Sequence, residues 1–282
     1  MTETPIETTP SHAHPAKGRH PGAPFYAAIF DMDGLLVDSE PVWREVEIEI
    51  FKRYGVTLTA AMCIQTKGMF LPDVARYWYA RRPWKGATPD EVASEVLDAM
   101  AARLENGAEL KPGALHAVDV CEHHGMRLAV ASSSPRRLID AVLAGLGLTE
   151  RFAVVHSAEE EPAGKPDPAI FRTTAQLLEV DPARCVVFED APAGVLAAKA
   201  AGMACVAVPE AHPHDADEPH DASAGPDDPA GREGFERADV VLGSLTELDD
   251  TVLARLAANG DEPGQPPRSR RRRRISALYS GK

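Results

Sequence analysis

The stretch Phe25-Tyr-Ala-Ala-Ile-Phe-Asp-Met-Asp-Gly34 is an apolar run that leads directly into two aspartates and a glycine. Such a run is typical of a strand buried on both faces of a parallel sheet. The aspartates then follow at the carboxyl end of the strand, where open α/β sheets bind their ligands. Asp31 and Asp33 leave an extended backbone on the same side, and the glycine permits a tight turn after them. Two carboxylates so placed can attack an electrophile, move a proton and attract a divalent cation, which suits phosphoryl transfer.

Further apolar runs of similar length follow along the chain, and helix-like segments separate the later ones. This alternation predicts an α/β fold, a Rossmann-like, doubly wound parallel sheet with right-handed crossovers. A last run at 238–242 could add an edge strand, with a helix near 245–258 behind it. The expected strands are Phe25–Phe30, Arg127–Ala131, Phe152–His156, Cys185–Phe188 and Cys205–Val208, and the expected helices between them are Pro135–Gly147, Pro168–Val180 and Pro192–Ala201.

The segment between the first two strands breaks this rhythm, because it carries helical patterning without any strand signal. We interpret residues 41–110 as a helical cap domain inserted after the first strand of a core formed by residues 25–40 and 111–258. Caps of this kind can close over a site and exclude water. Its expected helices are Glu45–Tyr54, Pro72–Arg82 and Pro89–Glu105.

Three segments lack the pattern of folded structure. Residues 1–24 are predicted to be a disordered leader, and residues 210–237 an acidic flexible loop within the core. Residues 259–282 form a basic tail, in which positions 264–282 carry six arginines, one lysine and no acid. Removing these seven cations from the net charge of −13 leaves −20, so the body is unsuited to nucleic acid. The tail is the only candidate for such a contact, and a disordered tail without this role is the favoured interpretation.

Composition indicates an ordinary globular protein, with 44% hydrophobic and 26% charged residues. The four cysteines are widely spaced without a CxxC pair, which predicts reduced thiols in a cytoplasmic protein. No apolar run approaches the roughly 18 residues of a membrane span. The amino-terminal residues also lack the apolar region of a signal peptide.

Polar groups follow three of the other expected strands. Ser132–Pro135 offers hydroxyl and backbone N–H groups at the start of a helix, a setting suited to phosphate. Lys165 stands between a glycine and a proline, and its ammonium could neutralise phosphate charge. Glu189 and Asp190 are adjacent acids whose repulsion a bound cation would relieve.

These four motifs, in this order, resemble those of the haloacid-dehalogenase-like phosphohydrolases. The helical insertion resembles the cap of the β-phosphoglucomutase-like branch. Within it, residues 38–43 and 78–84 are similar to phosphatases of hexitol phosphates and 2-deoxyglucose-6-phosphate. The resemblance covers roughly Tyr26 to Pro209, and Ala191 departs from it because relatives usually carry serine there.

The resemblance implies a role for each motif residue. Asp31 would be the nucleophile that forms an aspartyl-phosphate, and Asp33 the general acid and base. Ser132, the Ser133 N–H group and Lys165 would hold the phosphoryl oxygens.

The resemblance also implies a Mg²⁺ site. The ion would bind Asp31, the Met32 carbonyl and Asp190, with Glu189 orienting its water ligands. In the cap, Lys67 is a candidate for substrate specificity, and a solvated lysine is an equal alternative.

The implied function is a Mg²⁺-dependent phosphatase of small phosphorylated sugars or polyols. One alternative is a β-phosphoglucomutase-type mutase, against which Trp43 stands where mutases carry histidine. The other is a catalytically silent scaffold that acts through its arginine-rich tail. Trp78, Tyr79 and Trp84 fit the core of the cap better than a platform for sugar.

Overall fold

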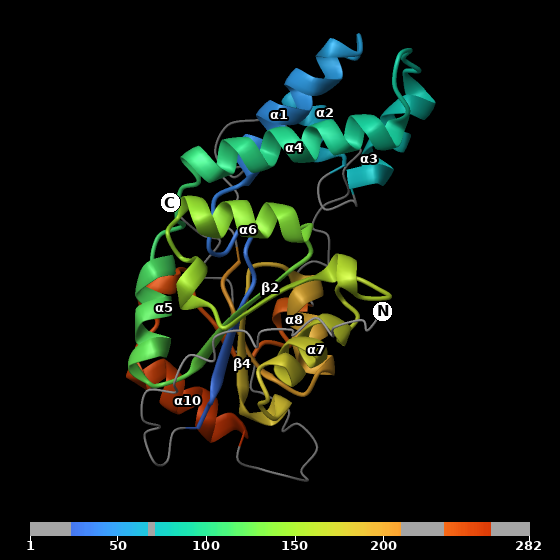
Figure 1. The fold of residues 1–282 in the computed structure, drawn as a ribbon. Coiled ribbons are helices and arrows are strands. Elements are labelled where there is room, and N and C mark those ends of the chain that lie inside the picture. The colour runs from blue at the N-terminus through green and yellow to red at the C-terminus, as the bar shows by residue number, and fades with distance from the viewer. Residues whose placement is uncertain (1–23, 67–70, 210–233, 261–282) are drawn as a thin grey trace, which may run out of the picture.

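The computed structural model describes residues 24–66, 71–209 and 234–260 (Figure 1). Within these residues, parallel strands form a six-stranded sheet in the order β3-β2-β1-β4-β5-β6. The order reverses at β1, as the doubly wound fold predicted from the sequence requires. The strands are β1 Ala27–Phe30, β2 Arg127–Ser132, β3 Val154–Ser157, β4 Cys185–Glu189, β5 Ala204–Ala207 and β6 Val240–Val241.

Helices cover both faces of the sheet because successive strand residues point to opposite sides. In β1, Ala28 and Phe30 pack on one face, and Ala27 and Ile29 on the other. The first face is covered by α5 Ala114–His123, α6 Arg136–Gly145 and α10 Asp250–Gly260, and the second by α7 Ala169–Leu177 and α8 Pro192–Ala200. Short 3₁₀ turns complete the core at Thr149–Arg151, Ala158–Glu160, Pro182–Arg184 and Leu245–Glu247.

A helical insertion follows the first strand, as expected, and lies beyond the carboxyl end of the sheet (Figure 1). Trp78 and Trp84 are buried inside it, whereas Tyr79 is 37% exposed. A capping box between Thr88 and Glu91 fixes the start of its longest helix. Its helices are α1 Glu40–Arg53, α2 Ala60–Ile64, α3 Leu71–Arg81 and α4 Pro89–Gly107.

The chain enters and leaves this insertion through two paired linkers. Val37 and Leu110 form an antiparallel bridge, and the Asp38 N–H group donates to the Glu109 carbonyl at 3.0 Å. On the far side of the bridge, the Lys111 N–H group donates to the Leu36 carbonyl at 2.9 Å. The insertion is therefore anchored directly beside the loop that follows β1.

A second contact joins the insertion to the core along α4 and α6 (Figure 1). A Cβ atom at Gly145 of α6 would lie 2.5 Å from the Glu105 carbonyl oxygen and 2.6 Å from that of Leu104. Arg137 of α6 also forms an ion pair with Asp98 of α4. The two helices thus approach closely enough for glycine to be required.

Several sequence predictions differ from the structure or lie outside it. Helices α2 and α5 were not predicted, and the edge strand β6 is two residues long rather than five. Lys67 lies outside the described residues, as do most of the leader, of the acidic loop and of the basic tail. The bounds proposed for the domains stay predictions. All four cysteines are free and buried, and none of the helices within the described ranges is long and apolar enough to cross a membrane.

Candidate active site

A tight loop follows β1 and carries the first motif. The Asp31 N–H group donates to the Phe188 carbonyl at 3.0 Å, which extends the pairing of β1 and β4. Gly34 has φ +78°, and a Cβ atom there would lie 2.1 Å from Asp190 Oδ2. Glycine is therefore needed at this position both for its backbone conformation and for the approach of the carboxylate.

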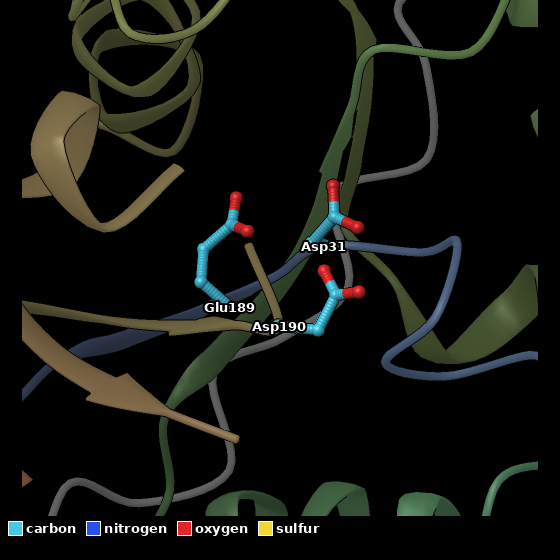
Figure 2. Close-up of side chains that lie close together, drawn as sticks. All are labelled: Asp31, Glu189 and Asp190. Atoms are coloured by element: carbon cyan, nitrogen blue, oxygen red, sulfur yellow. The ribbon is translucent and has the colours of Figure 1, made fainter. Parts of the chain in front are cut away.

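Three carboxylates meet where β1 and β4 end, and we call Asp31, Glu189 and Asp190 the carboxylate cluster (Figure 2). One carboxylate oxygen from each lies within 4.8 Å of the others. Asp31 is 6% exposed and Glu189 is 1% exposed. A Cβ atom at Gly194 would lie within 2.2 Å of the Glu189 carboxylate, so a glycine on α8 makes room for this acid.

Lys165 enters the carboxylate cluster from the loop before α7. Its ammonium donates to Asp31 Oδ1 and to Glu189 Oε1, each at 2.5 Å, and to the Ala131 carbonyl at 3.1 Å. Its side chain is only 7% exposed. Burial lowers the pKa of Lys165, but the two carboxylates outweigh it and raise the pKa above its usual value. The lysine is therefore a fixed cation.

One lysine does not balance the three acids. Burial raises the pKa of Asp31 well above its ordinary range, Lys165 opposes the shift, and the other two acids reinforce it. Burial, and next the charge of Glu189, raises the pKa of Asp190 to about 7. The raised pKa values reflect burial first, and then the excess of negative over positive charge in the carboxylate cluster. A divalent cation with oxygen ligands fits this donor set.

Asp33 has entirely different neighbours, although a single residue separates it from Asp31. Ser39 Oγ donates to Asp33 Oδ1 at 2.6 Å, and Ser134 Oγ donates to Oδ2 at 2.7 Å. Ser132 Oγ lies farther away, 3.4 Å from Oδ2. We call Ser39, Ser132 and Ser134 the serine group. Neutral hydroxyls thus surround this carboxylate on both oxygens.

The structure brings together six of the residues predicted for the site. Ser132 ends β2 beside Asp33, and Ser133 is exposed in the short loop between β2 and α6. The Met32 carbonyl accepts backbone hydrogen bonds from Leu36 at 2.9 Å and Val37 at 3.1 Å, so the loop already engages it. The residues that meet are Asp31, Asp33, Ser132, Lys165, Glu189 and Asp190.

Sequence reasoning missed two residues of the site, Ser39 and Ser134. Both belong to segments that had been singled out, residues 38–43 and 132–135. The pattern could mark the segments but not the side-chain directions, because several rotamers of a serine are compatible with each backbone.

Comparison with known proteins shows the family to which the chain belongs. The model of the haloacid dehalogenase-like hydrolase family matches residues 26–202, and the chain belongs to that family. Hexitol phosphatase B of Escherichia coli is 38% identical over 79% of this chain and 93% of its own. A fructose-1-phosphate phosphatase of the same species is 36% identical over 64% of this chain and 94% of its own. Within the family, the chain is a phosphatase.

Solved structures show the same fold. The protein CbbY of Rhodobacter sphaeroides, solved in complex with phosphate, aligns with a TM-score of 0.64 and 25% identity over 79% of this chain and 96% of its own. A β-phosphoglucomutase of Clostridium difficile aligns with a TM-score of 0.65 and 20% identity over 83% of this chain and 98% of its own. The resemblance inferred from the motifs is thereby confirmed.

Proposed function

We propose that this protein is a Mg²⁺-dependent phosphatase that hydrolyses small sugar or sugar-alcohol phosphates through an aspartyl-phosphate on Asp31. The observation that carries the proposal is the contrast between the two aspartates of the first loop. Asp31 is held by a lysine within the carboxylate cluster, whereas Asp33 is held by neutral hydroxyls. The similarity to hexitol and fructose-1-phosphate phosphatases supports the class of sugar and sugar-alcohol phosphates. We propose 2-deoxyglucose-6-phosphate as a further substrate of this class.

The carboxylate cluster fits a divalent cation, and Mg²⁺ would be held by Asp31 and Asp190. The Met32 carbonyl is engaged by the loop, so we propose the neighbouring Asp33 carbonyl in its place. Among the described residues, no backbone N–H group donates to that carbonyl. Glu189 would orient the water ligands while it stays paired with Lys165. The bound cation would neutralise charge on the phosphoryl group.

In the first step, an Asp31 carboxylate oxygen attacks phosphorus as the bond from phosphorus to the sugar oxygen breaks. Asp33, protonated at that moment, gives its proton to the departing oxygen. In the second step, Asp33 takes a proton from water, whose oxygen attacks the aspartyl-phosphate. The bond from Asp31 to phosphorus then breaks and inorganic phosphate leaves. Such proton transfer contributes about 10²–10⁴-fold to a rate.

The phosphoryl oxygens would be bound where β2 and α6 meet. Ser132 Oγ and the Ser133 N–H group would donate to them from one side, and Lys165 from the other. Donors fixed before the reaction stabilise the charge that develops in the transition state without reorganising. Lys67 remains our candidate for contact with the sugar.

The second candidate function is that of a phosphosugar mutase, which the fold of the β-phosphoglucomutase structure favours. Trp43, in place of the histidine expected of mutases, favours hydrolysis instead. A silent scaffold has no need of the complete set of charged motif residues. Hydrolysis therefore remains the stronger proposal.

The test is inorganic phosphate release from sorbitol-6-phosphate, mannitol-1-phosphate, fructose-1-phosphate, 2-deoxyglucose-6-phosphate and β-glucose-1-phosphate. We expect release that needs Mg²⁺, that a chelator abolishes, and that Asp31→Asn reduces by at least about 10³-fold. Asp119→Asn is the matched control, because it removes the same charge from a surface ion pair with Arg151. Conversion of β-glucose-1-phosphate to glucose-6-phosphate without release of phosphate would establish the mutase instead.

A further inference from the structure

Ser134 has no assigned task in the proposed reaction, yet it makes the shortest contact from the core to Asp33. Its hydroxyl donates to Asp33 Oδ2 at 2.7 Å, and the residue is 8% exposed. Ser132, the residue expected to grip phosphate, is 3.4 Å from the same oxygen. The stronger hydrogen bond to the carboxylate therefore comes from Ser134.

We infer that Ser134 is a positioning residue, which orients the Asp33 carboxyl group toward the leaving oxygen of the substrate. Ser157 in turn fixes the position of Ser134. This inference rests on the proposed function and adds a specific device to it. A proton donor must lie within hydrogen-bond reach of the atom it serves, and small misplacements of catalytic groups are costly.

Hydroxyls flank both oxygens of the Asp33 carboxylate. Ser39 donates to one oxygen from the start of the helical insertion, and Ser134 donates to the other from the core. Together they fix the rotation of a side chain that would otherwise turn freely. Of these two serines, only Ser134 belongs to the core, just after the end of β2, because Ser39 directly precedes α1 of the insertion.

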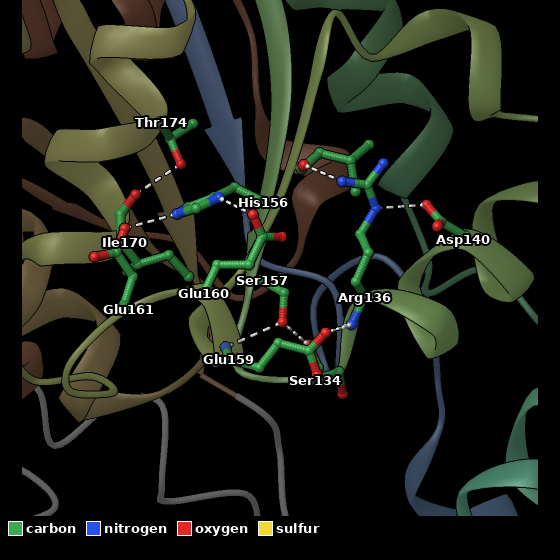
Figure 3. A network of polar contacts seen from close by, with 11 residues as sticks. Ser134, Arg136, Asp140, His156, Ser157, Glu159, Glu160, Glu161, Ile170 and Thr174 are labelled. Carbon is green, nitrogen blue, oxygen red and sulfur yellow. Dashed lines mark hydrogen bonds and ion pairs between the residues drawn. The ribbon is translucent and has the colours of Figure 1, made fainter.

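Ser134 is itself held by a network of hydrogen bonds (Figure 3). Ser157 Oγ donates to the Ser134 carbonyl at 2.7 Å, and Ser157 is fully buried at the end of β3. The Glu159 N–H group donates to Ser157 Oγ at 3.2 Å. Glu159 Oε1 accepts the Arg136 N–H group at 3.1 Å. The backbone on both sides of Pro135 is therefore tied to the end of the neighbouring strand.

This arrangement frees Ser132 for the substrate. The Ser134 N–H group donates to Ser132 Oγ at 3.0 Å, which leaves the Ser132 hydroxyl proton to be directed elsewhere. Because Ser134 already satisfies Asp33 Oδ2, Ser132 can donate to a phosphoryl oxygen without leaving the carboxylate unpaired. Ser134 therefore holds the Asp33 carboxyl group, and Ser132 is left to bind the phosphoryl group.

A hydroxyl also suits a group that must change its protonation state. It donates to a carboxylate and accepts from a carboxylic acid, so one partner serves both forms. A lysine in its place would favour the ionised form, as Lys165 does for the carboxylate cluster. The neutral serine holds the position of Asp33 without fixing its charge.

The experiment compares two leaving groups in the full-length protein with Mg²⁺. Expulsion of a sugar oxygen needs a proton, whereas p-nitrophenyl phosphate releases a stable anion that does not. Both substrates share the second step, so the measurement is the single-turnover rate at which the leaving group appears. We expect Ser134→Ala to lower this rate by about 10- to 100-fold for the best sugar phosphate, and by less than about threefold for p-nitrophenyl phosphate. KM should stay within about twofold for both, and Ser134→Thr should restore most of the activity.

Two further variants complete the test. Ser157→Ala should produce the same selectivity at a smaller size, about threefold, and it carries the test if Ser134→Ala does not fold. Thr174→Val is the control, since it removes a buried hydroxyl that donates to the Ile170 carbonyl at 2.7 Å, away from Asp33. It should leave the ratio of the two substrates unchanged.

The outcomes separate the two proposals. A wild-type protein that releases no phosphate would contradict the proposed function. An active protein in which Asp33→Asn selectively impairs the sugar phosphate, while Ser134→Ala impairs both substrates equally or changes only KM, would overturn the positioning role alone.

Discussion

Asp31 and Asp33 stand on one loop, separated by one residue, but the chain gives them opposite surroundings. Asp31 lies in the carboxylate cluster, where buried like charges face a single lysine. Asp33 lies in the serine group, where every side-chain partner described is a neutral hydroxyl. In the first setting, burial and neighbouring acids oppose the ionised form of Asp31, so a bound cation is needed to favour the carboxylate that attacks. The second surrounds a carboxyl group with neutral hydrogen-bond donors on both oxygens.

The difference shows how one motif supports two kinds of chemistry. Identical side chains acquire separate roles because neighbouring strands bring different groups to each. Charge controls the carboxylate cluster, so its behaviour should depend on pH and on metal. Geometry controls the serine group, so substitutions there should leave metal binding unchanged.

Among the variants that compare the two surroundings, the largest effect is expected from removing the ammonium group of Lys165, which faces the carboxylate cluster. Lys165→Met leaves buried acids without their partner, so the free energy of unfolding at pH 8 should fall by about 3 kcal/mol. Phosphate release should fall by at least about 100-fold, because the charge that faces the phosphoryl group is lost. Urea unfolding and steady-state assays measure the two effects.

Lys199→Met is the control for this variant, since it breaks a partly exposed ion pair with Asp239 on another part of the sheet. It should cost less than about 1 kcal/mol and leave the ratio of kcat to KM unchanged. Equal destabilisation by the two variants would show that the carboxylate cluster does not carry the excess charge inferred here.

The next effect is the pH dependence of metal binding. The pKa of Asp190 is raised from 3.8 to about 7 in the metal-free protein, so below pH 7 a proton competes with the cation. Magnesium affinity should be full at pH 8 and should weaken by about tenfold for each pH unit below 7 if one proton is displaced. Titration calorimetry at pH 8 and pH 6 measures the change.

The same shift has a consequence for the metal-free fold. Between pH 3.8 and 7 the folded protein holds a proton that the unfolded chain has lost. Stability without metal should therefore fall as pH rises through this window, and added Mg²⁺ should reverse the trend. A metal affinity that is unchanged from pH 8 to pH 6 would break the contrast between the two aspartates.

The smallest effect is expected in the serine group. Ser39→Ala removes one of two hydroxyls that fix Asp33, so kcat for the sugar phosphate should fall by about three- to tenfold. The stabilisation by Mg²⁺ should stay as in the wild type. Ser94→Ala on the exposed side of α4 is the matched control. A loss of metal affinity in Ser39→Ala would show that the two surroundings are not separate.

The core and its charged motifs could be predicted because the signals for them lie in short, continuous stretches of sequence. Apolar runs that are buried on both faces mark parallel strands, and the carboxyl ends of such strands meet at one edge. Asp31, Lys165 and Asp190 therefore had to converge once the strands were recognised. The two-residue strand β6 was overestimated, because the apolar run around it is longer than the part that pairs with β5.

The finer features depend on geometry that a pattern does not contain. The direction of the Met32 carbonyl follows from the turn of its loop, and the hydrogen bonds of Ser39 and Ser134 follow from side-chain rotation. The short helix α2 was missed because five residues carry too little periodicity. Helix α5 follows Gly113, whose φ of +83° marks a sharp entry from the linker that sequence alone did not reveal.

The close packing at Gly145 bears on how such enzymes could exchange their helical insertions during evolution. Because the two linkers pair at Val37 and Leu110, the insertion could in principle be exchanged as one segment at this point. The last turns of α4, however, rest against α6 so tightly that the facing residue has no side chain. A transplanted insertion would have to bring a helix end of matching shape. A helical insertion that is transferred between enzymes must therefore include the residues that pack α4 on α6, and cannot be defined by the linkers alone.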